Sequence, residues 1–326
     1  MQQQNSDKLI TIIGGSGFVG RHVVRALAKR GYRIRVACRR PDLAGHVVPL
    51  GVPGQIVPMQ ANVRYPASVA AACEGAYAVI NLAAIFQAGG AQTFDGVHVF
   101  GAEAVAKAAK ATKAQVLIHM SGLGADDVKS DSAYVQSRGA GEAKARGAYQ
   151  GAIILRPSVI FGPEDKFFNK FAALARFSPA LPMIGADTKL QPVFVGDVAE
   201  AVARLVDKGV ADGTTYELGG PDVKTMRQIM SYVLDVTYRK RLLINLPFPM
   251  ASLIGTLVGW LPGAPITSDQ VEVLKADNVV SAAASSEGRD LKGLGIVARG
   301  FDGIVPSYLY RFRKAGQFTA PTTAAE

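Results

Sequence analysis

The chain has 326 residues, of which 49% are hydrophobic and 19% charged, so a large core can form and general disorder is excluded. Only two cysteines are present, Cys38 and Cys73, which excludes a disulfide scaffold and a cysteine-rich metal site and fits a reducing compartment. The formal net charge of +10 would favour binding to an anionic membrane face or a phosphate-rich ligand, or it is simply that of a basic soluble protein. A nucleic-acid partner is not expected, because the basic residues are not interleaved with aromatic ones.

The first half of the chain alternates β-rich runs with helical patterns. The β-rich runs lie at 9–13, 33–37, 55–59, 78–82, 115–120 and 152–155, and the helical patterns at 18–30, 66–73, 95–112 and 133–147. Apolar strands separated by helices pair in parallel through right-handed crossovers. We therefore expect an α/β fold with a Rossmann-like, doubly wound parallel sheet.

After Arg156 the pattern loosens and prolines become frequent. Helical patterns lie at 198–208, 226–236 and 267–276, with a short strand pattern at 215–218. They predict a smaller C-terminal α/β lobe that is built on the sheet domain and partly interleaved with it. The expected division is a nucleotide-binding domain over 8–160, a substrate or docking lobe over 161–317 and a disordered tail over 318–326.

A glycine-rich turn separates the first predicted strand from the first helix. Gly14, Gly17 and Gly20 have the spacing at which the first glycine permits a tight turn, the second admits a pyrophosphate and the third lets helix pack on strand. Its place in a βαβ unit indicates a dinucleotide site rather than a turn that merely packs. The cofactor contacts expected here are Gly14, Ser16, Gly17, Phe18, Val19 and Gly20.

The end of the second strand bears on the choice of dinucleotide. NAD-selective sites typically place Asp or Glu there, whereas this chain has Arg39 and Arg40, whose guanidinium groups suit a 2′-phosphate. Residues 21–40 hold eight Lys or Arg and no Asp or Glu. The sequence therefore predicts NADP(H) as cofactor, the alternative being a solvated basic face.

Residues 8–220 resemble the atypical short-chain dehydrogenase/reductase family. The resemblance rests on the glycine turn, on short motifs after the third, fourth and fifth strands, on Tyr134, and on the run over 156–163. In that family these positions line the adenine, the pyrophosphate and the nicotinamide. The resemblance implies further cofactor contacts at Asn62, Val63, Leu82, Ala83, Ala84, Ser121, Tyr134, Arg138, Pro157, Val159 and Phe161.

Motifs at 161–169, 191–199 and 268–278 extend the resemblance to about residue 315. They resemble the subgroup that contains the NADPH-binding accessory subunit of respiratory complex I. This implies a mainly structural nucleotide, off the electron path. It also implies peripheral-arm and membrane-junction subunits of complex I as partners, with an anionic membrane surface as a further candidate. Residues 1–8 have no signal or transit pattern, so we expect the cytoplasmic side of a bacterial inner membrane rather than the mitochondrial matrix.

In active relatives, a Tyr passes a proton to the substrate oxygen and a Lys four residues later lowers the pKa of that Tyr. Here Tyr134 is followed by Arg138, a permanent cation of different shape, and Ser121 is placed to bind a substrate carbonyl. We expect Tyr134 and Arg138 mainly to hold the cofactor. The alternatives are a free NADP-dependent reductase or epimerase acting on a small carbonyl or sugar nucleotide, and a regulator that senses the NADPH/NADP ratio. The four histidines are too scattered for a metal site.

The stretch over 246–265 is a further candidate for function. Apolar residues repeat at helical spacing from Met250 to Leu261, and Arg239, Lys240 and Arg241 precede them. A basic cluster beside an apolar helix suits a protein or bilayer interface, and a helix packed inside the lobe is the open alternative. Prolines interrupt the uncharged stretch over 242–268, so we expect no transmembrane span.

Overall fold

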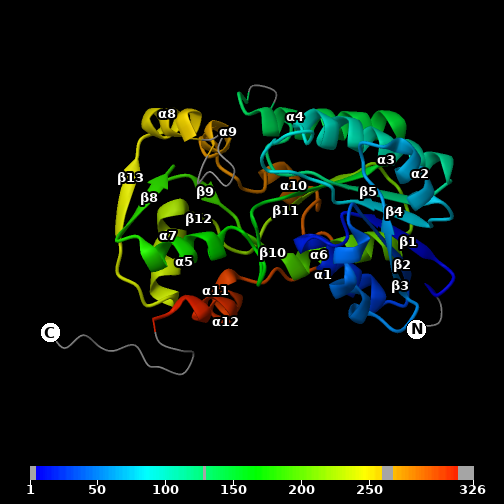
Figure 1. Ribbon diagram of the computed structural model, residues 1–326, viewed down its shortest axis with the longest axis horizontal. Coiled ribbons are helices and arrows are strands. Elements are labelled where there is room, and N and C mark those ends of the chain that lie inside the picture. The colour runs from blue at the N-terminus through cyan, green and yellow to red at the C-terminus, as the bar shows by residue number, and fades with distance from the viewer. Residues whose placement is uncertain (1–4, 128–129, 259–266, 315–326) are drawn as a thin grey trace. The chain divides into compact units, whose positions relative to one another are not determined.

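The chain forms two compact units, and the computed structural model describes residues 5–127, 130–258 and 267–314 (Figure 1). The first unit consists of the residues up to Pro157 together with Val195–Leu218 and Val280–Val297. The second consists of Ser158–Phe194, Gly219–Val279 and the residues from Ala298 onward. The sequence-based division at residues 160 and 317 stays a prediction, and the tail predicted over 318–326 lies outside the described residues.

A seven-stranded sheet forms the centre of the first unit, in the order β11-β6-β5-β4-β1-β2-β3. Its strands are β1 (Leu9–Ile13), β2 (Arg33–Cys38), β3 (Ile56–Gln60), β4 (Ala78–Asn81), β5 (Val116–Met120), β6 (Ile153–Pro157) and β11 (Thr215–Leu218). All neighbouring strands are parallel, with fully buried side chains such as Ile10, Ile12 and Ile80. The order changes direction between β1 and β4, which confirms the predicted doubly wound, Rossmann-like sheet.

Helices cover both faces of this sheet, with α1 packed beside α6 on one face and α2, α3 and α4 on the other (Figure 1). Their bounds are α1 (Phe18–Ala28), α2 (Pro66–Cys73), α3 (Phe100–Ala111), α4 (Ala133–Ala148), α6 (Val195–Lys208) and α10 (Ala282–Ser286). Val23, Val24 and Leu27 are buried on one face of α1, as their spacing predicts. Both cysteines are buried free thiols, and burial raises the pKa of Cys73 to about 11.

Short segments complete the first unit. A π-helical turn, η4 (Asp95–Val99), precedes α3, so the helix predicted over 95–112 begins with a wider turn. Two 3₁₀ segments, η2 (Pro41–Leu43) and η3 (Gly45–Leu50), follow β2 and bring the chain back toward α1.

The second unit has three two-stranded pairings, β7 with β10, β9 with β12, and β8 with β13. The strands are β7 (Ile160–Phe161), β8 (Ala180–Ile184), β9 (Lys189–Leu190), β10 (Val193–Phe194), β12 (Lys224–Thr225) and β13 (Leu242–Leu246). The helices are α5 (Phe168–Phe177), α7 (Met226–Val236), α8 (Phe248–Val258), α9 (Ser268–Val273), α11 (Phe301–Ile304), α12 (Pro306–Leu309) and the 3₁₀ turn η5 (Tyr310–Phe312). Its core contains Phe161, Phe168 and Phe301 in edge-on or tilted contact.

Asp165 organises the start of α5. Its carboxylate accepts backbone N–H groups from Gly162, Phe167 and Asn169, and it accepts the Tyr308 hydroxyl at 2.7 Å. The carboxylate is buried, so these donors compensate for its lost hydration. The distinctive motif over 161–169 therefore has a structural role in the second unit.

Helix α8 has an unusual burial pattern after Phe248, because two of its small residues face inward while several large apolar ones are exposed. Ala251 is fully buried, and a Cβ on Gly255 would lie 2.6 Å from the backbone nitrogen of Ser268. Leu253 and Leu257 are 61% and 64% exposed. The alternative of a helix buried in the lobe is therefore wrong for the described part of this stretch, and Trp260 and Leu261 lie outside the described residues. Within the described residues no helix combines the length and the apolar character needed to span a bilayer.

Candidate functional site

The predicted site residues of the first unit lie at the carboxyl edge of its sheet. Gly14 follows β1, Arg39 follows β2, Asn62 follows β3, Leu82 follows β4 and Ser121 follows β5. In a doubly wound sheet, ligands bind beside the carboxyl ends of the strands where the order reverses. The reversal between β1 and β4 places the glycine turn and the Leu82 segment side by side at that point.

The glycine turn has the backbone that phosphate binding requires. Gly14 has φ +79°, in the left-handed region that favours glycine, and its N–H donates to Ala37 O at 2.8 Å. A Cβ on Gly20 would lie 2.5 Å from the carbonyl oxygens of Gly14 and Gly15, so only glycine allows α1 to start this close to β1. Among the described residues, a Cβ on Gly17 would meet one atom within 4 Å, the Gly14 oxygen at 3.3 Å. The first turn of α1 has no acidic residue, so its N–H groups are available to an anion.

The segment after β4 lies directly against this turn. Leu82 N–H donates to Ile13 O at 2.9 Å, and a Cβ on Gly14 would be 3.3 Å from the Leu82 carbonyl. Ala83 N–H donates to the Asn81 side chain, and Ala84 is exposed. The structure thus brings Gly14, Leu82 and Ala83 together, as the resemblance implies.

Both arginines after β2 are exposed and already paired within the chain. Arg39 Nη1 donates to Gln92 Oε1 at 2.5 Å. Arg40 forms an ion pair with Asp42 at 2.6 Å, and this hydrogen bond lowers the pKa of the Asp42 carboxyl. Gln92 and Asp42 are partners that the sequence analysis missed, and Asp42 puts a negative charge next to the expected 2′-phosphate position.

His46 is another residue that the sequence analysis did not connect with the site. Its Nε2 lies 3.1 Å from the carbonyl oxygen of Ser16, and its Nδ1 lies 3.2 Å from that of Leu43. These contacts hold η3 against the glycine turn. No local pattern marks His46, because Ser16 and His46 are 30 positions apart.

Asn62 and Val63 have structural contacts after β3. Asn62 Oδ1 accepts the backbone N–H of Arg64 at 3.1 Å, and the Asn62 N–H donates to Ser68 Oγ, which fixes the turn before α2. Val63 is 7% exposed and packs against Gly101 of α3, where a Cβ would be only 2.9 Å away. Their contact with adenine remains a prediction.

Tyr134, Arg138 and Ser121 come together at the carboxyl end of β5. Arg138 Nη2 donates to the carbonyl oxygen of Ser121 at 2.7 Å, and the Arg138 guanidinium carbon lies 5.7 Å from the centre of the Tyr134 ring. A Cβ on Gly122 would be 4.0 Å from the Tyr134 hydroxyl. Ser132 begins α4 by accepting the N–H of Val135, which directs Tyr134 and Arg138 toward this edge.

Three buried polar atoms in this group have no partner among the described residues, namely Ser121 Oγ and the Nε and Nη1 atoms of Arg138. Arg138 is 4% exposed and pairs with no described carboxylate. Burying such a cation lowers the stability of the folded chain unless a ligand supplies hydrogen-bond acceptors. The hydroxyls of a ribose fit these donors, so the residues present suit a dinucleotide.

Two buried histidines lie behind this group. The Ile85 N–H donates to His98 Nε2 at 3.0 Å, so His98 Nδ1 carries the proton and donates to Ser137 Oγ at 2.9 Å. Asn81 Nδ2 lies 3.1 Å from His119 Nδ1. Burial, reinforced by the charge of Arg138, lowers the pKa of both rings to about 3. Both imidazoles are therefore neutral near pH 7.

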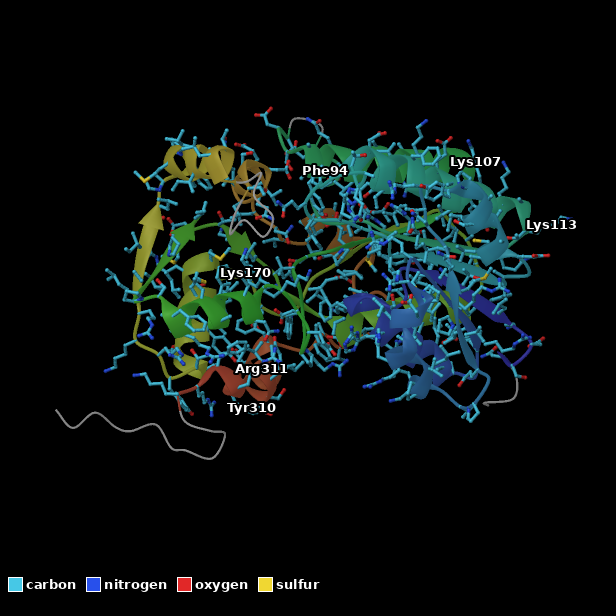
Figure 2. All side chains as sticks on the ribbon, in the orientation of Figure 1. Phe94, Lys107, Lys113, Lys170, Tyr310 and Arg311 are labelled. Atoms are coloured by element: carbon cyan, nitrogen blue, oxygen red, sulfur yellow. The ribbon has the colours of Figure 1, made fainter. Side chains whose placement is uncertain are left out.

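Aromatic rings surround Tyr134. Phe86 stacks on it with centroids 5.7 Å apart, while Phe94 and His98 meet it edge-on at 5.9 and 5.6 Å. Phe94, labelled in Figure 2, directly precedes η4, and the π turn brings His98 under the ring. No local sequence pattern marks Phe86, Phe94 and His98 as neighbours of Tyr134.

The remaining predicted cofactor-binding residues belong to different units. Pro157 ends β6 in the first unit and is buried. Val159 and Phe161 belong to the second unit, where Phe161 is fully buried in the aromatic core. The roles of Val159 and Phe161 toward a nucleotide remain predictions.

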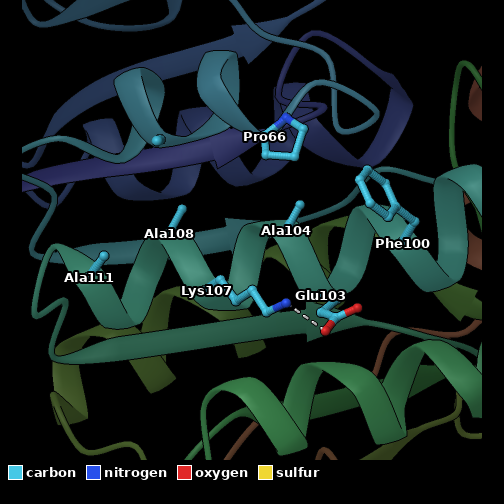
Figure 3. A pocket seen from close by; sticks show the side chains of 8 residues that line it. Pro66, Phe100, Glu103, Ala104, Lys107, Ala108 and Ala111 are labelled. Carbon is cyan, nitrogen blue, oxygen red and sulfur yellow. Dashed lines mark ion pairs between the residues drawn. The ribbon is translucent and has the colours of Figure 1, made fainter.

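A hollow in the first unit has a mostly apolar wall. This hollow, of about 270 Å³ between α2 and α3, has Phe100 and alanines in its wall, and its charged residues Glu103 and Lys107 pair with each other at 2.8 Å (Figure 3). Within the described residues, no group of three or more His, Cys, Asp or Glu side chains is arranged to hold a metal ion.

Comparisons with known proteins agree with this geometry. The model of the NAD dependent epimerase/dehydratase family matches residues 10–219. A protein of Arabidopsis thaliana, NADH dehydrogenase [ubiquinone] 1 alpha subcomplex subunit 9, mitochondrial, is 34% identical over 94% of this chain and 78% of its own. The ceramide reductase of Caulobacter vibrioides is 32% identical over 86% of this chain and 88% of its own.

Among solved structures, the NADPH complex of the quinone oxidoreductase QOR2 from Escherichia coli has a TM-score of 0.72. It is 21% identical and covers 92% of this chain and 99% of its own, which shows a shared fold. Together with the glycine turn, the family match identifies the cofactor as a nicotinamide dinucleotide.

Proposed function

Because this chain belongs to the NAD dependent epimerase/dehydratase family, we propose that it is an NADP(H)-binding accessory subunit of a complex I-type NADH:quinone oxidoreductase. The observation that carries the proposal is the 34% identity to the Arabidopsis subunit, which extends over 94% of this chain and so includes both units. The motif around Asp165 lies in the second unit, and its partner Tyr308 comes from the part of the chain beyond residue 219, where the family model's match ends.

A nicotinamide dinucleotide supplies hydride-transfer chemistry when it is bound. In this chain the glycine turn would hold the pyrophosphate, and Arg39 and Arg40 a 2′-phosphate, which favours NADP(H) over NAD(H). Arg138 and Ser121 would hold the nicotinamide ribose with the donors that otherwise lack acceptors. Bound nucleotide then stabilises the first unit by mass action.

A mainly structural role for the nucleotide is supported by Arg138. Its guanidinium is fixed to the Ser121 carbonyl, and the ring of Tyr134 is packed among Phe86, Phe94 and His98. A planar guanidinium held in this way serves as a fixed donor for a ligand and replaces the flexible lysine of active relatives.

A second candidate function is a free NADP-dependent reductase of the same family. It is favoured by the presence of Tyr134 and Ser121 and by the 32% identity to a ceramide reductase. Turnover separates the two proposals. Rapid NADPH oxidation with a carbonyl substrate, abolished in Tyr134→Phe, would support the reductase and contradict a structural nucleotide.

The proposed location is the membrane periphery, on the cytoplasmic side of a bacterial inner membrane, with peripheral-arm and membrane-junction subunits as partners. The test is to tag the chain in its source organism, extract membranes with mild detergent, and identify by mass spectrometry what migrates with it in native electrophoresis. We expect complex I subunits. A chain that migrates alone would overturn the proposal.

A matched pair of glycine variants refines this experiment. Gly20→Ala blocks the nucleotide turn, whereas a Cβ on Gly147, in α4, meets nothing within 4 Å. If the nucleotide supports assembly, Gly20→Ala reduces co-migration with complex I and Gly147→Ala does not.

A further inference from the structure

The second unit carries a dense group of cations where α5 ends and β13 begins. The group consists of Arg176, Arg239, Lys240, Arg241 and Arg313, and we call it the basic patch. Arg241 Nε donates to Ala175 O at 2.8 Å, and Arg239 donates to Phe312 O at 2.8 and 2.9 Å. Neutral carbonyls thus hold both guanidinium groups in place without cancelling their charge.

The basic patch carries more positive charge than the described residues around it balance. None of its members forms an ion pair with a described residue. Burial and the neighbouring charges of Arg241 and Arg176 lower the pKa of Arg239, so these three groups stand close enough to repel. A hollow of about 320 Å³ lies here, and among the described residues that line it Asp235 is the one carboxylate, against Arg239, Lys240 and Arg241.

Large apolar side chains stand exposed among these cations. Phe177 is 82% exposed, with the Arg176 guanidinium carbon 5.3 Å from its ring centre. Leu242, the first residue of β13, is 66% exposed, and Leu174 and Ile244 are also exposed. In Figure 1, β13 leads from this region to α8, which also exposes large apolar side chains, Leu253 and Leu257 among them.

We propose that the basic patch, with Phe177 and Leu242, docks the second unit on an anionic lipid bilayer. Lipid phosphates supply the negative charge that the chain does not, and the boundary between headgroups and acyl chains accepts Phe and Leu side chains that lie between cations. A protein partner would favour an apolar centre with a polar rim, whereas here the two kinds of side chain are intermingled.

This inference goes beyond the proposed function, because it requires only the chain and lipid. The test is co-sedimentation of the full chain, with NADPH present, with vesicles of phosphatidylcholine alone or with added phosphatidylglycerol. We expect binding only to the anionic vesicles and release by salt. The double variant Arg176→Glu/Lys240→Glu should bind at least about 25-fold more weakly, since each cation near such a surface contributes about fivefold.

The matched control is Lys110→Glu/Lys292→Glu, which makes the same charge change at exposed positions of the first unit. We expect it to bind like the wild type. Phe177→Ser should also weaken binding, and Val297→Ser, at a 90% exposed position of the first unit, should not. Circular dichroism of each variant verifies that it is folded.

Three results would overturn the inference. They are equal binding to neutral and anionic vesicles, equal loss in both double variants, and no vesicle binding by a chain that still sediments with native membranes. The last would assign the patch to a protein partner. Failure to co-migrate with complex I would contradict the proposed function but leave the vesicle result standing.

Discussion

Arg138 donates from Nη2 to the carbonyl oxygen of Ser121 across 2.7 Å, and its Nε and Nη1 atoms have no partner among the described residues. The backbone thus holds a buried guanidinium group at the edge of the sheet, and this group has hydrogen-bond donors that no described residue uses. Unsatisfied buried donors lower the stability of the ligand-free protein, and a ligand that accepts their hydrogen bonds removes this cost.

Arg138→Met tests this relationship, because it removes the charge and roughly keeps the volume. We expect the nucleotide-free protein to become more stable by about 1–3 kcal/mol, since two unsatisfied donors disappear. NADPH affinity should fall at the same time. Chemical unfolding without nucleotide and calorimetric titration with NADPH measure the two effects, and unchanged NADPH affinity would contradict the ligand-holding role.

Acid should destabilise the first unit through His98 and His119. Their pKa values are lowered from 6.5 to about 3, so between those values the unfolded chain binds more protons than the folded one. Stability should therefore be fully present above about pH 6.5 and be lost as the pH falls toward 3, by up to about 1.4 kcal/mol per pH unit for each ring. Urea unfolding at several pH values checks this, and His119→Gln should flatten the dependence. The carboxylates titrate alike in both proteins, so equal slopes would contradict the assignment.

Gly20→Ala should disrupt the glycine turn. Its Cβ would lie 2.5 Å from two backbone oxygens, so α1 must shift, at a cost of about 1–3 kcal/mol in stability. NADPH binding should be lost. Gly147→Ala, in an exposed part of α4, should instead gain about 0.5–1 kcal/mol. Thermal unfolding of both variants, with and without NADPH, makes the comparison.

Arg39→Ala/Arg40→Ala should weaken NADPH binding more than NADH binding. Each arginine can donate a charged hydrogen bond to a 2′-phosphate, so the preference should change by at least about tenfold. Asp42→Asn, which frees Arg40 from its partner, should shift the preference toward NADPH. Fluorescence titration with both nucleotides measures this. Equal losses for NADPH and NADH would show that these arginines do not select the 2′-phosphate.

Leu253→Ser/Leu257→Ser should leave the fold intact. Both side chains are more than 60% exposed, so the change in unfolding free energy should stay within about 0.5 kcal/mol. Val271→Ser is the buried counterpart, since Val271 is fully buried beside α8, and it should cost several times more. Thermal unfolding separates them. Lost membrane co-sedimentation in the folded double variant would assign α8 to an interface.

The elements that the sequence predicts well are those whose signals are local. The strands at 9–13 and 215–218 and the helices at 66–73 and 226–236 have the predicted bounds. The last begins at Thr225, whose side chain and that of Gln228 form a reciprocal capping box. The helix predicted over 267–276 ends at Val273, because Asp277 and Asn278 hydrogen-bond instead with Lys189 of β9.

The parts of the site that could not be predicted depend on long-range pairing. The sequence places Arg39, Arg40, Tyr134 and Arg138 correctly along the chain, but their partners come from elsewhere. Gln92 reaches Arg39 from 53 positions away, and Ser121 reaches Arg138 from 17. The spacing of apolar residues predicts which face of a helix or strand is buried, but it does not predict which loop will pack against that element.

The order of segments along the chain has a consequence for how the protein is made. A ribosome delivers the glycine turn first, yet α6, which packs on α1, and β11, which pairs with β6, emerge only after residues 158–194 of the other unit. Tyr308, the hydroxyl donor to Asp165, emerges near the end of the described chain. Each unit needs segments that are synthesised after parts of the other, so a sheet edge and part of the core stay uncovered through much of synthesis. The protein's dependence on chaperones should therefore exceed that of relatives whose domains are contiguous, and truncation before residue 297 should leave both units unfinished.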